Sequence, residues 1–162
     1  MSVSLQEVNL IDFIQEVNNE NFDNTKEMRE DSSLNELHMH KLLYFLYGKF
    51  WREFQKELFK PKFLAWKYGP VEINYRNYLK APVGSKEAEG FYKKFWVRVN
   101  KQEMKFLHEE INWLAELPDY YLVDVSHTTR PWINHHEPNK SNEIPNQEIK
   151  DEFECFNFLV RT

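Results

Sequence analysis

The sequence predicts an all-α protein, a compact single-domain bundle of about six to eight helices around a central aromatic-rich helix at residues 34–55. Apolar residues recur at three- and four-residue spacing in several segments, as on the buried face of an amphipathic helix. Only 4 of the 162 residues are Gly, which fits long helices better than a fold of many tight turns. Aromatic residues make up 16% of the chain, so large flat side chains fill much of the predicted core.

The first predicted helix covers residues 5–17. Its apolar positions share one face and are Leu10, Ile11, Ile14 and Val17. The next segment, residues 18–32, is rich in Asn, Asp and Glu, which is typical of a polar loop. We therefore expect the first helix to reach the central one through an irregular connection.

The central helix begins at a capping-box signature, in which the side chains of Ser33 and Glu36 bond to free backbone amides. Its apolar residues cover most of the circumference, which is typical of a helix wrapped by others. They are Leu37, Met39, Leu42, Leu43, Tyr44, Leu46, Tyr47, Phe50, Trp51 and Phe54. Gly48 costs this helix about 1 kcal/mol relative to Ala, which predicts that another backbone or a large ring packs closely there.

Residues 61–68 are too short and too aromatic to predict a helix, so at most a minor extended segment is expected there. Gly69 and Pro70 form a structural turn and predict a helix over residues 70–79. This follows because a first helical position leaves its amide unpaired, and Pro has none to lose. Pro82 and Gly84 predict a turn at residues 81–85.

Two further helices are predicted between residues 86 and 117. The first spans 86–99, although the β-branched residues Val97 and Val99 weaken it near its end. The second starts at Asn100 with Glu103 and carries the most regular apolar stripe of the chain. Its members are Met104, Leu107, Ile111 and Leu114.

The carboxyl-terminal part of the chain is divided by prolines. Residues 119–125 predict either a short helix or an extended segment, and Pro131 predicts the start of a short helix. Residues 134–145 form a predicted polar loop. A last helix begins after Pro145, and its inward residues are Ile149, Phe153 and Phe156.

Charge and composition disfavour two classes of partner. The formal net charge of −5 opposes attraction to a nucleic-acid polyanion, and Glu residues interrupt the Lys and Arg of residues 86–105. The first residues show no basic, apolar leader, and no apolar run reaches membrane-spanning length. The single cysteine fits a reducing compartment. These features predict a cytoplasmic protein without a membrane partner.

No pattern indicates catalysis, a metal or a cofactor. The six histidines lack the spacing of a zinc site and are His38, His40, His108, His127, His135 and His136. Ser126 and His127 are chain neighbours, which is poor geometry for a nucleophile and its base. Cys155 follows Phe153 on an apolar face and is expected to be a buried small hydrophobe.

Four aromatic residues allow two interpretations, and they are Trp66, Tyr68, Tyr75 and Trp132. They pack between helices and hold the turn at Gly69 and Pro70, or some of them are exposed as anchors of an interface. Both hold at once if a rigid aromatic cluster forms the floor of a groove. Lys41 and Lys67 lie in apolar surroundings and have either helix ends or acidic groups as partners.

Several motifs follow one another in an order that resembles the Panacea domain family, which includes SocA-like antitoxins and many prophage-encoded proteins. They are KLLY at residues 41–44, AWKYGPV at 65–71, Tyr75 and Leu79, and Ser126 with His127 before Trp132. The resemblance spans roughly residues 33–155. The segment at 65–71 is its most specific part. The chain departs from the family pattern in a longer loop after the first helix and in the pair His135 and His136.

The resemblance implies a helical domain that neutralises a cognate toxin by direct contact, in some members as an adaptor that hands the toxin to a protease. The candidate partner-binding residues are Lys41, Tyr44, Trp66, Lys67, Tyr68, Tyr75, His127 and Trp132. The function predicted is therefore that of an antitoxin and not of an enzyme. Two alternatives stay open: a phage or prophage accessory protein that binds a host factor, and a DNA-binding regulator whose short helices mimic a helix-turn-helix.

Overall fold

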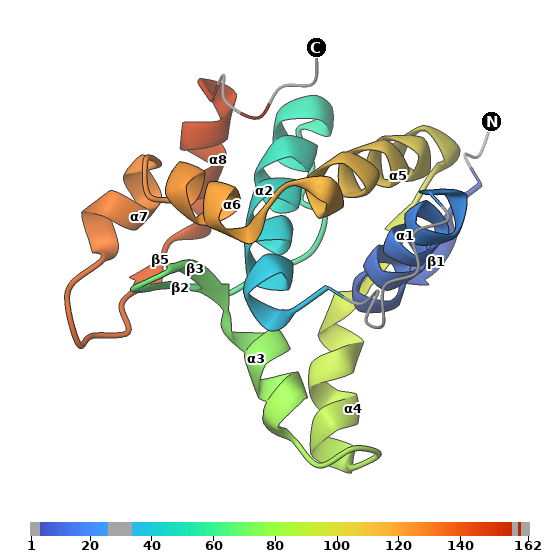
Figure 1. The fold of residues 1–162 in the computed structure, drawn as a ribbon, viewed down its shortest axis with the longest axis horizontal. Helices are drawn as coiled ribbons and strands as arrows, with labels where there is room; N and C mark the ends of the chain where they lie inside the picture. Colours follow the sequence, from blue (N-terminus) through green and yellow to red (C-terminus); the bar gives the residue numbers. More distant parts are fainter. Residues whose placement is uncertain (1–3, 26–33, 157–158, 160–162) are drawn as a thin grey trace.

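The computed structural model describes residues 4–25, 34–156 and 159 (Figure 1). In that part of the chain, eight α-helices and one short 3-10 helix accompany two small antiparallel sheets. The protein is therefore mostly helical but α+β, and the all-α prediction is wrong in this respect. The strands have at most four residues each, which is too short for an alternating pattern to stand out in the sequence.

Helix α2 (Glu36–Phe54) runs through the centre of the molecule, as predicted (Figure 1). Its N-cap is Asn35, which accepts a hydrogen bond from the amide of His38, and the predicted cap Ser33 lies outside the described residues. The helix is buried from His38 to Gly48. Four elements pack around it: β3 (Gly69–Glu72), α5 (Lys101–Glu116), α6 (Asp119–Ser126) and α8 (Asn146–Glu154).

Helix α8 closes the core against Gly48. A Cβ atom added to Gly48 would lie 2.2 Å from the ring of Phe153, which confirms that a large ring packs there. The helix begins after Pro145 and buries Ile149 and Phe153, as predicted. Cys155, however, is exposed, so its predicted burial is wrong. Helix α8 ends at Glu154, so Cys155 is not held on its buried face.

The amino-terminal segment starts as a strand and not as a helix. β1 (Gln6–Asn9) pairs with β4 (Trp96–Val99) in antiparallel register, with Val8 opposite Val97. Helix α1 (Leu10–Thr25) then packs against α5. It continues past residue 18, where the sequence predicts a polar loop, and residues 26–32 of that loop lie outside the described residues.

Residues 86–99 form three short elements where one helix is predicted. They are α4 (Lys86–Tyr92), the 3-10 helix η1 (Lys93–Phe95) and β4. In β4, Val97 and Val99 are buried while Trp96 and Arg98 are exposed. This alternation, with the strand preference of β-branched residues, explains why the helix stops.

The second sheet has the strand order β3-β2-β5, with β2 (Phe63–Trp66) between β3 and β5 (Glu143–Ile144). Lys67 and Tyr68 connect β2 to β3, and Gly69 follows with a φ of 104°. Pro70 belongs to β3 and does not start a helix, which corrects the prediction. An edge strand tolerates Pro because one side of its backbone has no strand partner.

Helix α3 (Ile73–Lys80) begins three residues later than predicted. Its N-cap is Glu72, whose carboxylate accepts a hydrogen bond from the amide of Tyr75 at 2.9 Å. α3 and α4 pack mainly against each other and extend from the body of the molecule (Figure 1). We call residues 73–92, which contain both helices and their turn, the arm.

The remaining helices agree with the sequence. Asn100 and Glu103 form the predicted capping box of α5, and α6 is the helical alternative for residues 119–125. Helix α7 (Arg130–His135) carries Pro131 in its first turn. Across residues 4–25, 34–156 and 159, no helix is both long enough and apolar enough to cross a bilayer.

Candidate functional site

The motif residues 65–71 form a hairpin corner that lies against α6 and α7. We define the corner site as Trp66, Lys67 and Tyr68 of the hairpin together with His127, Trp132 and His136. Lys67 and Tyr68 occupy the turn between β2 and β3 and are exposed. The other four residues are partly exposed. The corner therefore presents ring faces at the surface of the molecule.

Trp132 links the hairpin to α7. Its indole Nε1 donates a hydrogen bond to the carbonyl oxygen of Trp66 at 2.8 Å. Its ring is stacked between two imidazoles, with centroid distances of 4.0 Å to His127 and 4.5 Å to His136. Burial lowers the pKa of His127, against a hydrogen bond to the main chain of Lys67 that raises it. A neutral His127 ring thus packs on Trp132 at pH 7.

Lys41 holds the hairpin from below. Its side chain is completely buried, and Nζ donates a hydrogen bond to the carbonyl oxygen of Pro70 at 2.9 Å. Burial lowers the pKa of Lys41 to about 7, because the charged ammonium loses its hydration. Gly69 is required here, since a Cβ atom would lie 2.5 Å from both Lys41 Cε and Ser126 Oγ.

Tyr44 fixes the link between α6 and α7 from inside the core. Its hydroxyl lies 2.8 Å from the hydroxyl of Thr129, and Thr129 in turn donates to the carbonyl oxygen of Ser126 at 2.7 Å. Burial raises the pKa of Tyr44. The Ser126 hydroxyl donates to the carbonyl oxygen of Val123, so it is used in local structure and does not approach His127 as a nucleophile would.

A charged network supports the other side of the corner. The Arg76 guanidinium lies 5.1 Å from the Trp66 ring centroid and forms an ion pair with Glu36 at 2.7 Å. Glu36 also bonds His40 Nε2 at 2.9 Å. Burial lowers the pKa of His40 to about 4 despite this bond. For Glu36 the pKa is lowered, because the bonds to His40 and Arg76 outweigh the opposing effect of burial.

Tyr75 and Glu72 lie beneath this network. Tyr75 is 5% exposed, and its ring packs edge-on against His40. Glu72 is fully buried and accepts hydrogen bonds from the amides of Lys62 and Tyr75. Burial raises the pKa of Glu72 although these bonds oppose the shift. The Glu72 side chain therefore joins the residue before β2 to α3, next to the end of β3.

A hollow of about 520 Å³ lies beside the corner. Trp66 and Lys67 line one wall, while His136 and the loop from Glu137 to Ser141 line the other. Several lining residues have polar side chains, and among them Lys140 pairs with Glu137 at 2.8 Å. Lys67 also lies 5.4 Å from the Tyr68 ring centroid. The hollow thus offers cations, a carboxylate and ring faces within one surface.

The predicted site residues divide into two groups by position. Trp66, Lys67, Tyr68, His127 and Trp132 meet at the surface of the corner site. Three others are buried below it, and they are Lys41, Tyr44 and Tyr75. Their part in partner binding stays a prediction.

Sequence reasoning did not single out His136 or Arg76 for this site. His136 lies one helical turn after Trp132, so i, i+4 spacing gives a signal for their stacking. Arg76 has no such local signal, because it meets Trp66 only through the fold of the hairpin onto α3. Among the described residues, no group of three or more His, Cys, Asp or Glu side chains is placed to hold a metal ion.

The helices around α2, the two small sheets and the braced hairpin corner define a small α+β domain with an aromatic surface site. A comparison with protein families matches residues 39–133 to the family described as Antitoxin SocA-like, Panacea domain. The match covers more than half of the chain, from α2 through the corner to α7, and the chain belongs to this family. Comparisons with curated proteins and with solved structures give no match.

Proposed function

We propose that this protein is an antitoxin that neutralises its cognate toxin by binding it directly, without catalysing a reaction. Membership of the SocA-like antitoxin family is the observation that carries the proposal. Family membership suggests a toxin as partner, and the corner supplies a surface suited to protein binding. An adaptor function, in which the bound toxin is passed to a protease or chaperone, is a further step of the same proposal.

The corner site is the proposed contact surface for the toxin. Tyr68 is 59% exposed on a hairpin whose carbonyl oxygens are held by Lys41 and Trp132. Tyr and Trp are enriched among residues that dominate binding energy, since they bury a large area at low cost in side-chain entropy. A surface that is already rigid loses less conformational entropy when it binds. Lys41, Tyr44 and Tyr75 act in this proposal by positioning the corner.

Coexpression with the adjacent open reading frame tests the function. The neighbour alone is expected to stop growth, and this protein is expected to restore it. Tyr68→Ala should weaken the affinity of the purified pair about tenfold, as for an interface anchor. Tyr120→Ala is the matched control, because Tyr120 is 71% exposed on α6 and outside the corner site.

Four outcomes would contradict the proposal in different ways. A neighbour that is harmless, or stays toxic beside this protein, removes the antitoxin function. Recovery of a host protein without any neighbouring toxin favours an accessory protein, and a gel shift of its own promoter at physiological salt favours a DNA-binding regulator. Equal affinities for Tyr68→Ala and Tyr120→Ala would move the interface away from the corner.

A further inference from the structure

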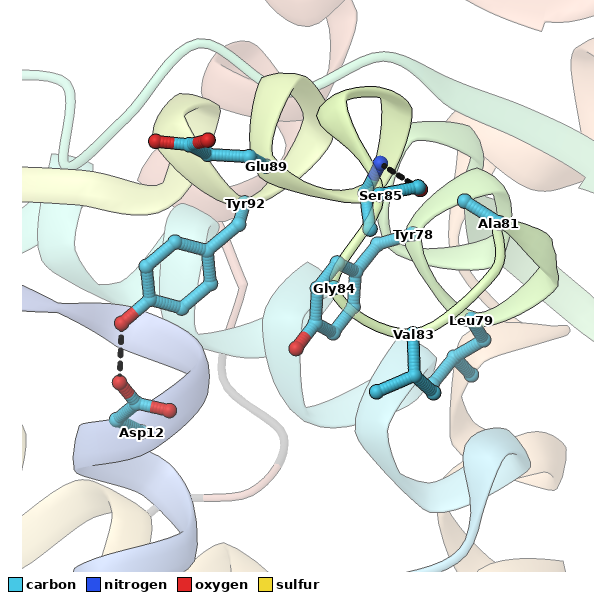
Figure 2. Close-up of a pocket in the computed structure, with 10 residues that line it drawn as sticks. Asp12, Tyr78, Leu79, Ala81, Val83, Gly84, Ser85, Glu89 and Tyr92 are labelled. Atoms are coloured by element: carbon cyan, nitrogen blue, oxygen red, sulfur yellow. Dashed lines mark hydrogen bonds between the residues drawn. The ribbon is translucent and has the colours of Figure 1, made fainter.

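The arm forms one wall of a second groove that the corner site does not include. Figure 2 shows this groove, in which side chains of α3, α4 and their turn face Asp12 of α1. Its volume is about 620 Å³. Most of its lining is apolar or aromatic and comprises Tyr78, Leu79, Ala81, Val83, Ala88 and Tyr92. The groove is large enough to receive several side chains of a partner.

Aromatic rings pack against one another along the groove. The ring centroids of Tyr78 and Tyr92 are 5.9 Å apart, and Tyr78 stacks on the buried Tyr75 at 6.4 Å. The Tyr92 hydroxyl donates a hydrogen bond to Asp12 Oδ2, which ties the arm to α1 (Figure 2). The groove therefore has a preformed shape although the arm extends from the body.

Two aliphatic side chains at the end of the arm are exposed to solvent. Leu79 is 45% exposed, and Val83 in the turn is fully exposed. Apolar area left in water forgoes about 25 cal/mol per Å² that burial would contribute. Contiguous apolar surface of this kind, rimmed by polar groups, is typical of a protein interaction site.

The charged residues that line the groove are both acidic. They are Asp12 and Glu89, and within the part of the chain that the structure describes no Lys or Arg lines the groove. Glu89 lies 3.8 Å from Lys93, but both side chains are about two-thirds exposed, and such surface pairs contribute little. An incoming cation can therefore replace Lys93 beside Glu89. The groove is complementary to an apolar segment that carries Lys or Arg.

The corner site by itself is too small to form a stable and specific protein interface. A stable and specific complex buries about 800 Å² on each partner, from some 20 residues a side. The corner site has six residues, of which four are only partly exposed. A partner that binds specifically needs further surface, and the arm carries the exposed apolar residues that a contact requires.

We propose that the arm groove binds an apolar segment of the cognate toxin flanked by Lys or Arg, with Leu79 and Val83 buried by the segment and Glu89 paired with its cation. This inference rests on the proposed antitoxin function. It adds to that function a second contact surface and the chemistry of the segment that fills it.

Binding of the purified adjacent-frame product, measured by calorimetry, tests the inference. Val83→Asp should weaken binding about tenfold, because it buries a charge in an apolar contact. Glu89→Lys should weaken it about fivefold and reduce its dependence on salt. Glu87→Lys is the matched control, since Glu87 lies in the same first turn of α4 and does not line the groove. We expect its effect to be less than about twofold.

The outcomes of this binding experiment separate the groove from the antitoxin function. If Val83→Asp and Glu89→Lys both bind the toxin with wild-type affinity, the groove is not a contact surface. The antitoxin function is unaffected by that result. A wild-type protein that does not bind the product overturns the function and the inference together. Equal losses in Glu89→Lys and Glu87→Lys would indicate general electrostatic attraction and overturn the groove as the specific site. A photo-crosslinker at position 83 should capture a toxin peptide with apolar and basic residues, and capture of an acidic peptide overturns the proposed chemistry.

Discussion

The corner site and the arm differ in how the rest of the protein supports them. At the corner, the buried Lys41 donates a hydrogen bond to the Pro70 carbonyl oxygen, and Trp132 of α7 donates one to the Trp66 carbonyl oxygen. In the arm, α3 and α4 pack mainly against each other. Each of these helices buries a single residue, Tyr75 in α3 and Ala88 in α4. Hydrogen bonds from other elements thus hold the corner in place, while most residues of the arm lie at the surface.

Under the proposed function, the corner and the arm contribute to partner binding in different ways. A braced corner keeps its rings in one arrangement, which favours selectivity for a partner of matching shape. The arm buries fewer residues and leaves Leu79 and Val83 exposed to solvent.

The largest effect on stability is expected from glycine substitutions, because an added Cβ atom meets close contacts at the corner and open space in the arm. Gly69→Ala should destabilise the protein by about 3 kcal/mol, since it combines a φ of 104° with contacts to Lys41 and Ser126. Gly84→Ala in the arm has a φ of 78° but no heavy atom within 4 Å, so about 1 kcal/mol is expected from the backbone alone. Urea unfolding measures both.

Gly90→Ala is the control for the arm. Gly90 lies inside α4, and nothing is within 4 Å of an added Cβ. Alanine should stabilise that helix by about 0.5 kcal/mol. Similar losses at Gly69 and Gly84 would show that the corner is no more tightly braced than the arm.

The second prediction concerns the buried ammonium below the corner. The pKa of Lys41 is lowered from 10.5 to about 7, so between these values the unfolded chain binds a proton that the folded chain has released. Stability should therefore rise with pH in this window, by about 2 kcal/mol from pH 7.5 to 9. Lys41→Met should remove this increase. The range stops at pH 9 because buried tyrosines favour unfolding above their normal pKa of about 10.

Thermal and urea unfolding of both proteins across this range measure the difference. Lys80→Met in the arm is the control, since Lys80 is exposed and its removal should leave the pH dependence unchanged. A parallel pH dependence in wild type and Lys41→Met would show that Lys41 stays charged in the fold. The hydrogen bond to the Pro70 carbonyl oxygen would then come from a charged ammonium.

The smallest effect tests the hydrogen bond between α7 and the hairpin. Trp132→Phe keeps a ring between His127 and His136 but removes the donor to the Trp66 carbonyl, which should cost about 1 kcal/mol of stability. Trp96→Phe is the control, because Trp96 is 49% exposed on β4 and such surface changes stay within about 0.5 kcal/mol. Equal losses of stability in the two variants would show that this hydrogen bond does not help to hold the hairpin against α7.

Local patterns predicted several elements of the fold correctly. The apolar circumference of α2, the ring against Gly48 and the capping box of α5 all follow from residues within a few positions of one another. The corner residues were identified through their resemblance to a family, since their sequence alone suggested a helix start at Pro70. Strand β2 falls within the extended segment expected at residues 61–68. Strands β1 and β4 were missed, because their pairing joins segments about ninety residues apart.

Spacing along the chain was enough to predict the central helix, the capping box of α5 and the motifs that mark the family. Only the tertiary structure decided which side chains became supports and which became surface. Lys41 and Tyr68 are both polar residues of the motif, yet one is buried under a carbonyl oxygen and the other is exposed in a turn. Burial depends on what packs from distant segments, and residue spacing does not encode that contact.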